Sequence, residues 1–216
     1  MHVKRELRSG TALSLVVALL TWSGASQAHN KFELDATIGA RVFGSGPAHF
    51  REEKTEGDEG KVYTRPALAY GGILGYRVER NGFVYLSFSR QVAPLHLDVN
   101  DQSDVVTGKL AIENYQFGGN VERTWGHWVP YFGVSVGAAR WASLGGGGSR
   151  VFFAAVFDGG IKFDLHKNIH LRLLGRLPFT FAHGDLYCMS AGRCVALSHF
   201  SPWVQVEAQF GLGASF

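Results

Sequence analysis

The chain has 216 residues and a formal net charge of +3, with 46% hydrophobic residues, 28 glycines and 13% aromatic residues. This length suits a single domain, and the near balance of acidic and basic residues gives no indication of nucleic-acid binding. Beyond residue 28, no apolar run reaches the roughly 20 residues that a transmembrane helix requires. If the protein spans a membrane, it must do so as a closed β-barrel, the only other structure that pairs every backbone polar group within lipid.

The first segment, residues 1–28, has the three parts of a secretory signal peptide. A basic start around Lys4 is followed by an apolar run over residues 11–20 and by small residues that end at Ala28. The apolar run is too short to cross a bilayer as a helix. We therefore expect cleavage after Ala28 and one barrel domain over residues 29–216.

Strict alternation of apolar and polar side chains predicts eight β-strands in this domain. The last one shows the pattern clearly, because Val204, Val206 and Ala208 alternate with Gln205 and Glu207. The expected strands cover residues 32–44, 65–78, 83–97, 108–123, 128–143, 151–165, 169–183 and 203–216. Their connections alternate between long and short, which predicts an all-β fold, an eight-stranded antiparallel up-and-down transmembrane barrel.

The long connections are expected to be exposed loops on the outer side. Residues 45–64 are polar, rich in acidic residues and without periodicity, which predicts a mobile loop. The remaining loops are expected at residues 98–107, 144–150 and 185–200. The short turns would face the periplasm, and the first of them contains the hairpin pair Asn81-Gly82.

Two positions interrupt the strand pattern. Pro94 is expected to mark the frayed outer end of the third strand, because proline cannot donate to a strand ladder. Glu113 falls on the apolar side of the fourth strand, which indicates a bulge or the end of the lipid-facing segment.

The polar faces of the strands carry charges of both signs among many glycines. In a soluble lipocalin-type barrel this face would meet water, but small residues and paired long charges suit the crowded interior of an eight-stranded membrane barrel. The expected lumen charges are Glu33, Asp35, Arg41, Arg77, Asp158, Lys162, Asp164, Arg172, Arg176 and Glu207. We expect opposite charges to pair and plug the lumen, with a narrow ion-permeable, porin-like pore as the alternative.

Aromatic residues near the predicted strand ends suggest the two girdles of a membrane barrel. Trp125 and Trp128 lie near a short turn, and Tyr70, Trp141 and Phe181 lie near the outer ends. These positions support lipid contact for the apolar faces.

The chain resembles the small eight-stranded bacterial outer-membrane barrels of the OmpA/OmpX type. The resemblance rests on the signal peptide, the strand rhythm, the segment VPYFGVSVGA at residues 129–138 and the terminal Phe216. It implies an outer-membrane location, both termini in the periplasm, and recognition of Phe216 by the barrel-insertion machinery. We also expect a monomer without cofactor or metal ion.

Two cysteines, Cys188 and Cys194, lie close together in the last long connection. In an exported chain they predict a disulfide. It would constrain one loop and contribute roughly 2–3 kcal/mol of stability. A metal site is the weaker interpretation, because two thiolates need further ligands, and His183 and His199 are separated from them by several residues.

A possible catalytic pair is His199 and Ser201. The motif resembles the His-x-Ser of outer-membrane lipid A deacylases, in which a base and a nucleophile share one face. The chain departs from that family at Pro202, where the family has asparagine, and the nearest acid is Glu207. A lipid A hydrolase is therefore the enzymatic alternative.

Five basic residues gather at the predicted outer strand ends, where they could bind lipopolysaccharide phosphates or snorkel at the rim. They are Arg65, Arg90, Lys109, Arg140 and Arg150. The function that the sequence favours is a surface or structural protein whose outer loops contact lipopolysaccharide or external partners.

Overall fold

The computed structural model describes residues 31–216, with gaps at 44–45, 53–54, 80, 100–101, 145–147, 183–185, 189–193 and 197–200. Side chains are also left undescribed over residues 43–64, 95–108 and 182–202. The expected signal peptide therefore lies outside the described residues and stays a prediction. In the described part of the chain, no helix is long and apolar enough to cross a membrane.

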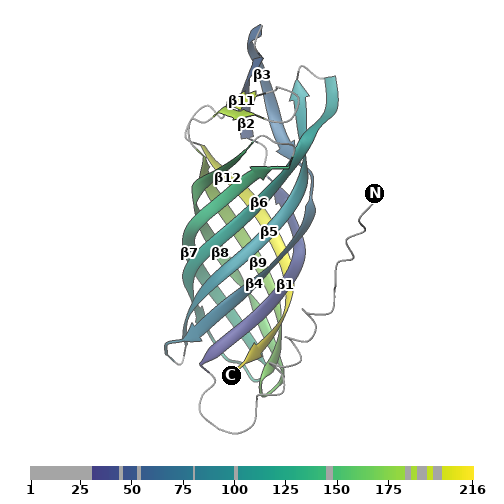
Figure 1. Cartoon of the computed structure of the whole chain (residues 1–216). Coiled ribbons are helices and arrows are strands. Elements are labelled where there is room, and N and C mark those ends of the chain that lie inside the picture. The colour runs from purple at the N-terminus through teal and green to yellow at the C-terminus, as the bar shows by residue number, and fades with distance from the viewer. Residues whose placement is uncertain are drawn as a thin grey trace, which may run out of the picture.

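Eight strands form a closed antiparallel barrel, as the sequence predicted (Figure 1). They are β1 (Phe32–Phe43), β4 (Ala67–Arg77), β5 (Gly82–Val99), β6 (Gln102–Glu122), β7 (Trp128–Ser143), β8 (Ser149–His166), β9 (Ile169–Ala182) and β12 (Ser201–Ser215). Each strand pairs with its neighbour in the chain, and β1 closes the ring against β12.

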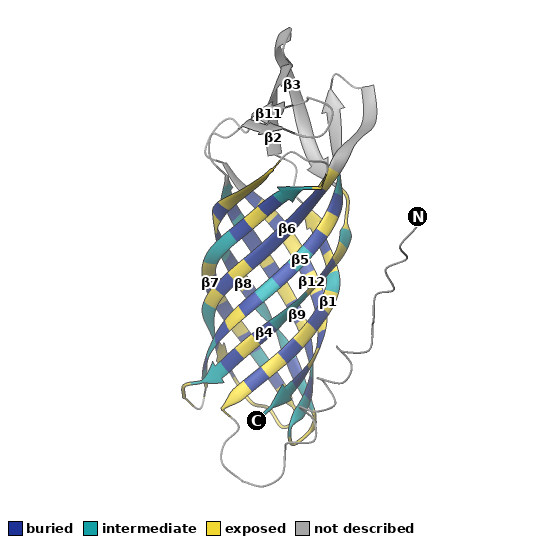
Figure 2. Cartoon of the chain, viewed as in Figure 1, coloured by how far each residue is buried: buried dark blue, intermediate teal, exposed yellow. Residues whose placement is uncertain are grey.

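The two faces of the wall differ as the alternation predicted (Figure 2). Large apolar side chains such as Phe132, Val206 and Phe210 are about half exposed or more on the outside, whereas charged side chains such as Arg41 and Glu207 are buried inside. A band of exposed apolar side chains around a polar interior is the arrangement of a membrane barrel. The lipocalin-type alternative, with its apolar face inside, is wrong for the described strands.

The wall continues beyond the barrel at the outer end, where the structure has four further strands in segments that were predicted to be loops. They are β2 (Gly46–Glu52), β3 (Thr55–Thr64), β10 (Leu186–Cys188) and β11 (Cys194–Ala196). β3 pairs with the outer part of β5, and β2, β11 and β10 follow in order. The prediction of structureless loops was wrong over these segments, because backbone pairing to an extended strand edge requires no apolar periodicity.

The hairpin between β5 and β6 is also longer than predicted, since only residues 100–101 separate the ends of the two strands. Pro94 does not end β5, which continues to Val99. β4 pairs with β5 up to Gln91 and β3 pairs with it from Leu95, so Pro94 lies where neither strand pairs with β5 on that side. A missing N–H is tolerated in such a place.

Of the two interpretations of Glu113, the bulge is wrong, and the end of the lipid-facing segment stays a prediction. β6 keeps its register through this residue, which lies opposite Arg90 of β5 and Arg140 of β7. The irregularities of the β5–β6 pairing lie further out, between Leu95 and His96 and between Leu97 and Val99.

The described ends of the chain meet at the end of the barrel that carries the short turns. Phe32 and Phe216 exchange two backbone hydrogen bonds of 2.9 Å, and their rings stack at 6.0 Å. By the usual rule for bacterial barrels this end faces the periplasm, and we name the two ends of the barrel accordingly.

Candidate functional site

The inward residues of β5 follow the lumen from its periplasmic end to its outer end. From Phe83 to Ser89, each of these inward residues meets a charged side chain from another strand, so charges are distributed along the interior. The successive contacts are Phe83 with Lys162, Tyr85 with Asp158, Ser87 with Arg176, and Ser89 with Arg41.

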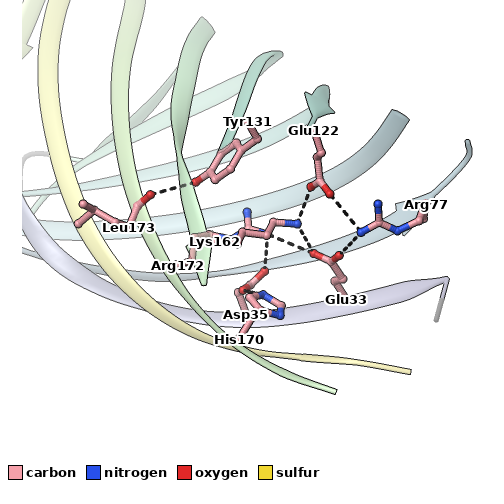
Figure 3. A network of polar contacts seen from close by, with 9 residues as sticks. All are labelled: Glu33, Asp35, Arg77, Glu122, Tyr131, Lys162, His170, Arg172 and Leu173. Carbon is pink, nitrogen blue, oxygen red and sulfur yellow. Dashed lines mark hydrogen bonds and ion pairs between the residues drawn. The ribbon is translucent and has the colours of Figure 1, made fainter. Parts of the chain in front are cut away.

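The periplasmic half of the lumen is crossed by a buried lower ion network (Figure 3). Glu33 lies at its centre, 2.5 Å from the Nζ of Lys162, 2.8 Å from Arg77 and 3.3 Å from Arg172. Glu122 binds Lys162 at 2.5 Å and Arg77 at 3.1 Å. These five residues come from β1, β4, β6, β8 and β9, so the network links strands on different sides of the lumen.

Asp35 completes the lower ion network. It lies 3.0 Å from Arg172 and 2.8 Å from the Nε2 of His170. Glu33, Asp35 and His170 each offer a ligand atom, and these atoms lie within 4.8 Å of one another, a spacing compatible with a metal ion. Arg172 and Lys162 already neutralise the carboxylates, so the group needs no metal to balance its charge.

Aromatic rings support the cations of this network. The Nζ of Lys162 lies 4.5 Å from the centre of the Phe83 ring, and the guanidinium of Arg172 lies 5.1 Å from the centre of the Tyr131 ring. Such cation–π contacts are strongest where the cation is removed from water. The Tyr131 hydroxyl is also 3.5 Å from the carbonyl oxygen of Leu173.

Inward glycines leave the space that these large side chains fill. A Cβ on Gly75 would overlap the ring of Phe83, and a Cβ on Gly213 would overlap both His170 and Asp35. The glycine-rich polar faces are therefore part of the packing of the lumen.

A second ion pair lies in the outer half of the lumen. The guanidinium of Arg41 binds Glu207 at 2.8 Å, and both side chains are 0% exposed. Arg41 also donates to Ser89, and its carbonyl oxygen accepts a 2.9 Å hydrogen bond from Gln91. Glu207 additionally accepts from Gln209.

The remaining expected lumen charges are also placed by the structure. Asp158 is buried and accepts a hydrogen bond from the Tyr85 hydroxyl, and Arg176 is buried and donates to Ser87 at 3.0 Å. Asp164 lies near the periplasmic turn and is half-buried.

Three aromatic residues lie inside the outer end of the lumen and form what we call the aromatic lid. Trp141 packs edge-on against Trp203 at 5.4 Å and against Phe152 at 5.3 Å. All three are at most 8% exposed. The expectation that Trp141 belongs to the outer girdle is wrong, because it shares the inward parity of Tyr131 on β7.

Two members of the lower ion network were missed in the sequence. Glu122 is the last residue of β6 and shares the inward face of Asn120, and His170 shares the inward face of Arg172. The alternation therefore contained the signal for both. Glu122 was overlooked beside the turn, and His170 because histidine is not counted as a charge.

The outer rim contains an ion trio on the lipid-facing side. Glu113 lies between Arg90, at 3.4 Å, and Arg140, at 3.1 Å, and it accepts a 3.2 Å hydrogen bond from the Tyr115 hydroxyl. Only 9% of the Glu113 side chain is exposed, whereas 36% and 45% of the two arginine side chains are exposed. The other three expected rim cations, Arg65, Lys109 and Arg150, are exposed.

The expected catalytic residues are not brought together within the described part of the chain. His199 lies outside the described residues, and Ser201 begins β12 with a side chain that is not described. Glu207 faces the lumen and is bound to Arg41. Glu207, the nearest acid to the expected pair, is therefore paired with Arg41 inside the barrel.

The cysteine side chains also lie outside the described residues, so the disulfide stays a prediction. The backbone places Cys188 of β10 directly opposite Cys194 of β11. Directly opposed residues of an antiparallel pair have Cβ atoms close to the separation that a disulfide needs.

A closed eight-stranded barrel with an apolar belt and a charged lumen defines the class of fold: a small transmembrane β-barrel of the bacterial outer-membrane type. No protein-family model and no curated protein matches the chain significantly. Solved structures match its fold.

The chain is similar to OprG from Pseudomonas aeruginosa, with a TM-score of 0.60 and 11% identity over 89% of this chain and 99% of that one. It is similar to Neisserial surface protein A, with a TM-score of 0.54 and 14% identity over 86% of this chain and 97% of that one. For AlkL in lipid bilayers the TM-score is 0.51, with 12% identity over 89% and 94% of the two chains. The TM-scores show a common fold. At identities this low, the matches indicate no specific activity.

Proposed function

We propose that the protein is a sealed outer-membrane barrel that acts as a surface or structural protein through its outer end. The observation that carries this proposal is the lower ion network, in which Glu33 binds cations from β4, β8 and β9 across the lumen. Opposite charges that neutralise one another in so narrow a lumen leave no continuous path for a hydrated ion.

The aromatic lid supports the same proposal from the other end. Trp141, Phe152 and Trp203 are buried where the lumen would open outward. An apolar constriction of this kind resists wetting and therefore resists ion passage. Two unlike barriers thus lie in series along the lumen.

Single-channel recording in planar bilayers tests the seal. The wild-type protein should give no steady conductance, and Arg123→Gln, a change at the periplasmic rim, should behave identically. A combined variant, with serine at Glu33, Lys162 and Arg172 and alanine at Trp141 and Trp203, truncates the centre of the lower ion network and two of the three lid residues and should pass current. Steady wild-type conductance would instead support the porin-like alternative.

The surface role rests on the strands that extend past the barrel at the end opposite both described chain ends (Figure 1). An epitope tag inserted between β2 and β3 should be labelled on intact cells. The matched control is a tag in the turn between Glu122 and Trp128, which should be labelled only after the outer membrane is permeabilised. The reverse pattern would contradict the proposed orientation.

A further inference from the structure

Among the described residues, the outward charges of the barrel wall lie on three neighbouring strands. Among described residues between the periplasmic turns and the outer rim, the outward charged side chains are Arg90 on β5, Lys109 and Glu113 on β6, and Arg140 on β7. In the described parts of β1, β4, β8, β9 and β12, the outward positions are uncharged. Within these three strands, Arg90 and Arg140 both contact Glu113, an arrangement that separately snorkelling cations do not need.

The height of the cluster matches the outer headgroup region. Along β7 the outward residues from Trp128 to Ala138 are all apolar, and Arg140 is the next outward position. At the usual rise and tilt of barrel strands, that apolar run covers roughly 25 Å, the height of the lipid-facing band. Arg140 and its partners therefore lie where the phosphates of outer-leaflet lipids begin.

The trio is arranged to present two guanidinium groups together. Arg90, Glu113 and Arg140 are directly opposite one another on three neighbouring strands, so the two arginine Cα atoms are roughly 10 Å apart. Each arginine contacts the carboxylate with one nitrogen, and the guanidinium has further N–H donors. Glu113 thus holds both arginines in place and leaves the trio with a net positive charge.

We propose that Arg90 and Arg140, positioned by Glu113, form a binding site for the phosphate group of an outer-leaflet lipid, with lipid A as the occupant. Arginine is suited to phosphate because its planar donors match the oxygens in pairs. The apolar surface below the trio, which includes Phe88 and Phe117, would contact the acyl chains of the same lipid. This proposal rests on the proposed surface role and specifies lipid A as a partner of that surface.

The test is a titration of the folded full chain in detergent micelles, followed by native mass spectrometry. The probes are bisphosphorylated lipid A, dephosphorylated lipid A with the same acyl chains, and inorganic phosphate as a competitor. We expect bisphosphorylated lipid A to bind at least about tenfold more tightly than the dephosphorylated form, as charge-assisted hydrogen bonds provide. Inorganic phosphate at millimolar concentration should not displace it.

Variants separate this site from general positive charge. The double variant Arg90→Gln/Arg140→Gln should abolish the tenfold preference. Arg123→Gln, at the opposite rim, should keep it within about threefold. Because the double variant leaves Glu113 without its cations, the triple variant that also carries Glu113→Gln provides a second test with no charge left in the trio.

The proposal is overturned if the triple variant folds and keeps the preference, if Arg123→Gln abolishes it equally, or if the wild type binds both lipids alike. If inorganic phosphate displaces lipid A, the site binds the free ion, and the proposal that lipid A is its occupant is wrong. These outcomes are independent of the proposed seal and surface exposure, because conductance and epitope labelling do not depend on lipid A binding.

Discussion

The Arg41–Glu207 pair provides the sharpest test of how the lumen is stabilised. Replacing Arg41 by methionine keeps much of the side-chain volume and removes the charge. Both side chains are 0% exposed, so Glu207 cannot recover its lost partner by contacting bulk water. Losing one member of such a buried pair costs about 3–5 kcal/mol, mainly because the other charge stays buried and uncompensated.

The matched double variant Arg41→Met/Glu207→Gln removes both charges. It should recover most of the loss and lie within about 1–2 kcal/mol of the wild type, since replacing a whole buried pair is often close to neutral. Arg123→Met is the surface control. Its guanidinium lies 5.5 Å from the Trp125 ring at an exposed turn, and it should change stability by no more than about 0.5 kcal/mol.

The assay is urea-induced unfolding in lipid vesicles, followed by tryptophan fluorescence and by heat-modifiable gel mobility. The free energies of unfolding of the wild type, Arg41→Met, Glu207→Gln and the double variant give the coupling energy between Arg41 and Glu207. The reasoning is refuted if Arg41→Met costs less than about 1 kcal/mol. It is also refuted if the double variant loses as much free energy of unfolding as the two single variants lose together.

Four further predictions follow from the described contacts and the sequence. Arg172→Ala should leave Asp35 without its arginine partner and lower the free energy of unfolding by about 3–5 kcal/mol in the same assay, while single-channel recordings stay silent. Gly75→Leu should prevent formation of the heat-modifiable folded band, because its side chain would occupy the position of the Phe83 ring, whereas Gly82→Ala, with only ordinary contacts, should fold. Thiol labelling after denaturation without reductant should detect no free cysteine, and labelling of both Cys188 and Cys194 would contradict the disulfide. Lipid A from cells that express the wild-type protein should have an unchanged mass, and loss of an acyl chain that requires Ser201 would revive the hydrolase alternative.

The barrel could be predicted from the sequence because its wall is specified by a local pattern. Alternation along β7 assigns Phe132 and Val134 to the lipid and Tyr131 and Ser135 to the lumen, and the burial of these residues agrees. The same parity places Trp141 inside. The girdle prediction failed there because it considered only the height of the residue along the strand.

The partners across the lumen could not be predicted, because they depend on how the strands are staggered around the ring. Glu33 and Lys162 are distant in the sequence, and only the closed register brings them to 2.5 Å. The same limit applies to Glu113. Its position on the apolar face suggested a bulge, whereas the regular pairing on both sides supplies Arg90 and Arg140 as its partners.

The extension above the barrel could not be predicted either. Residues 46–64 carry no periodic apolar pattern. β3 pairs with β5 beyond the outer end of β4, and β2 pairs with β3. A segment that gains its structure from an available backbone edge leaves no signal in its own side chains. Sequence reasoning about the outer ends of such barrels will therefore underestimate how far the strands continue.

The two charge clusters differ in a way that bears on where the protein acts. In the lower ion network, the carboxylates of Glu33, Asp35 and Glu122 are matched by the cations of Arg77, Lys162 and Arg172, so the interior needs no ion from solution. In the outer trio, two arginines share one carboxylate, and the excess positive charge is partly exposed. A balanced cluster stabilises the fold, whereas an unbalanced one at the membrane surface attracts an anion. Recognition by this protein is therefore expected on its outer surface and not within its lumen.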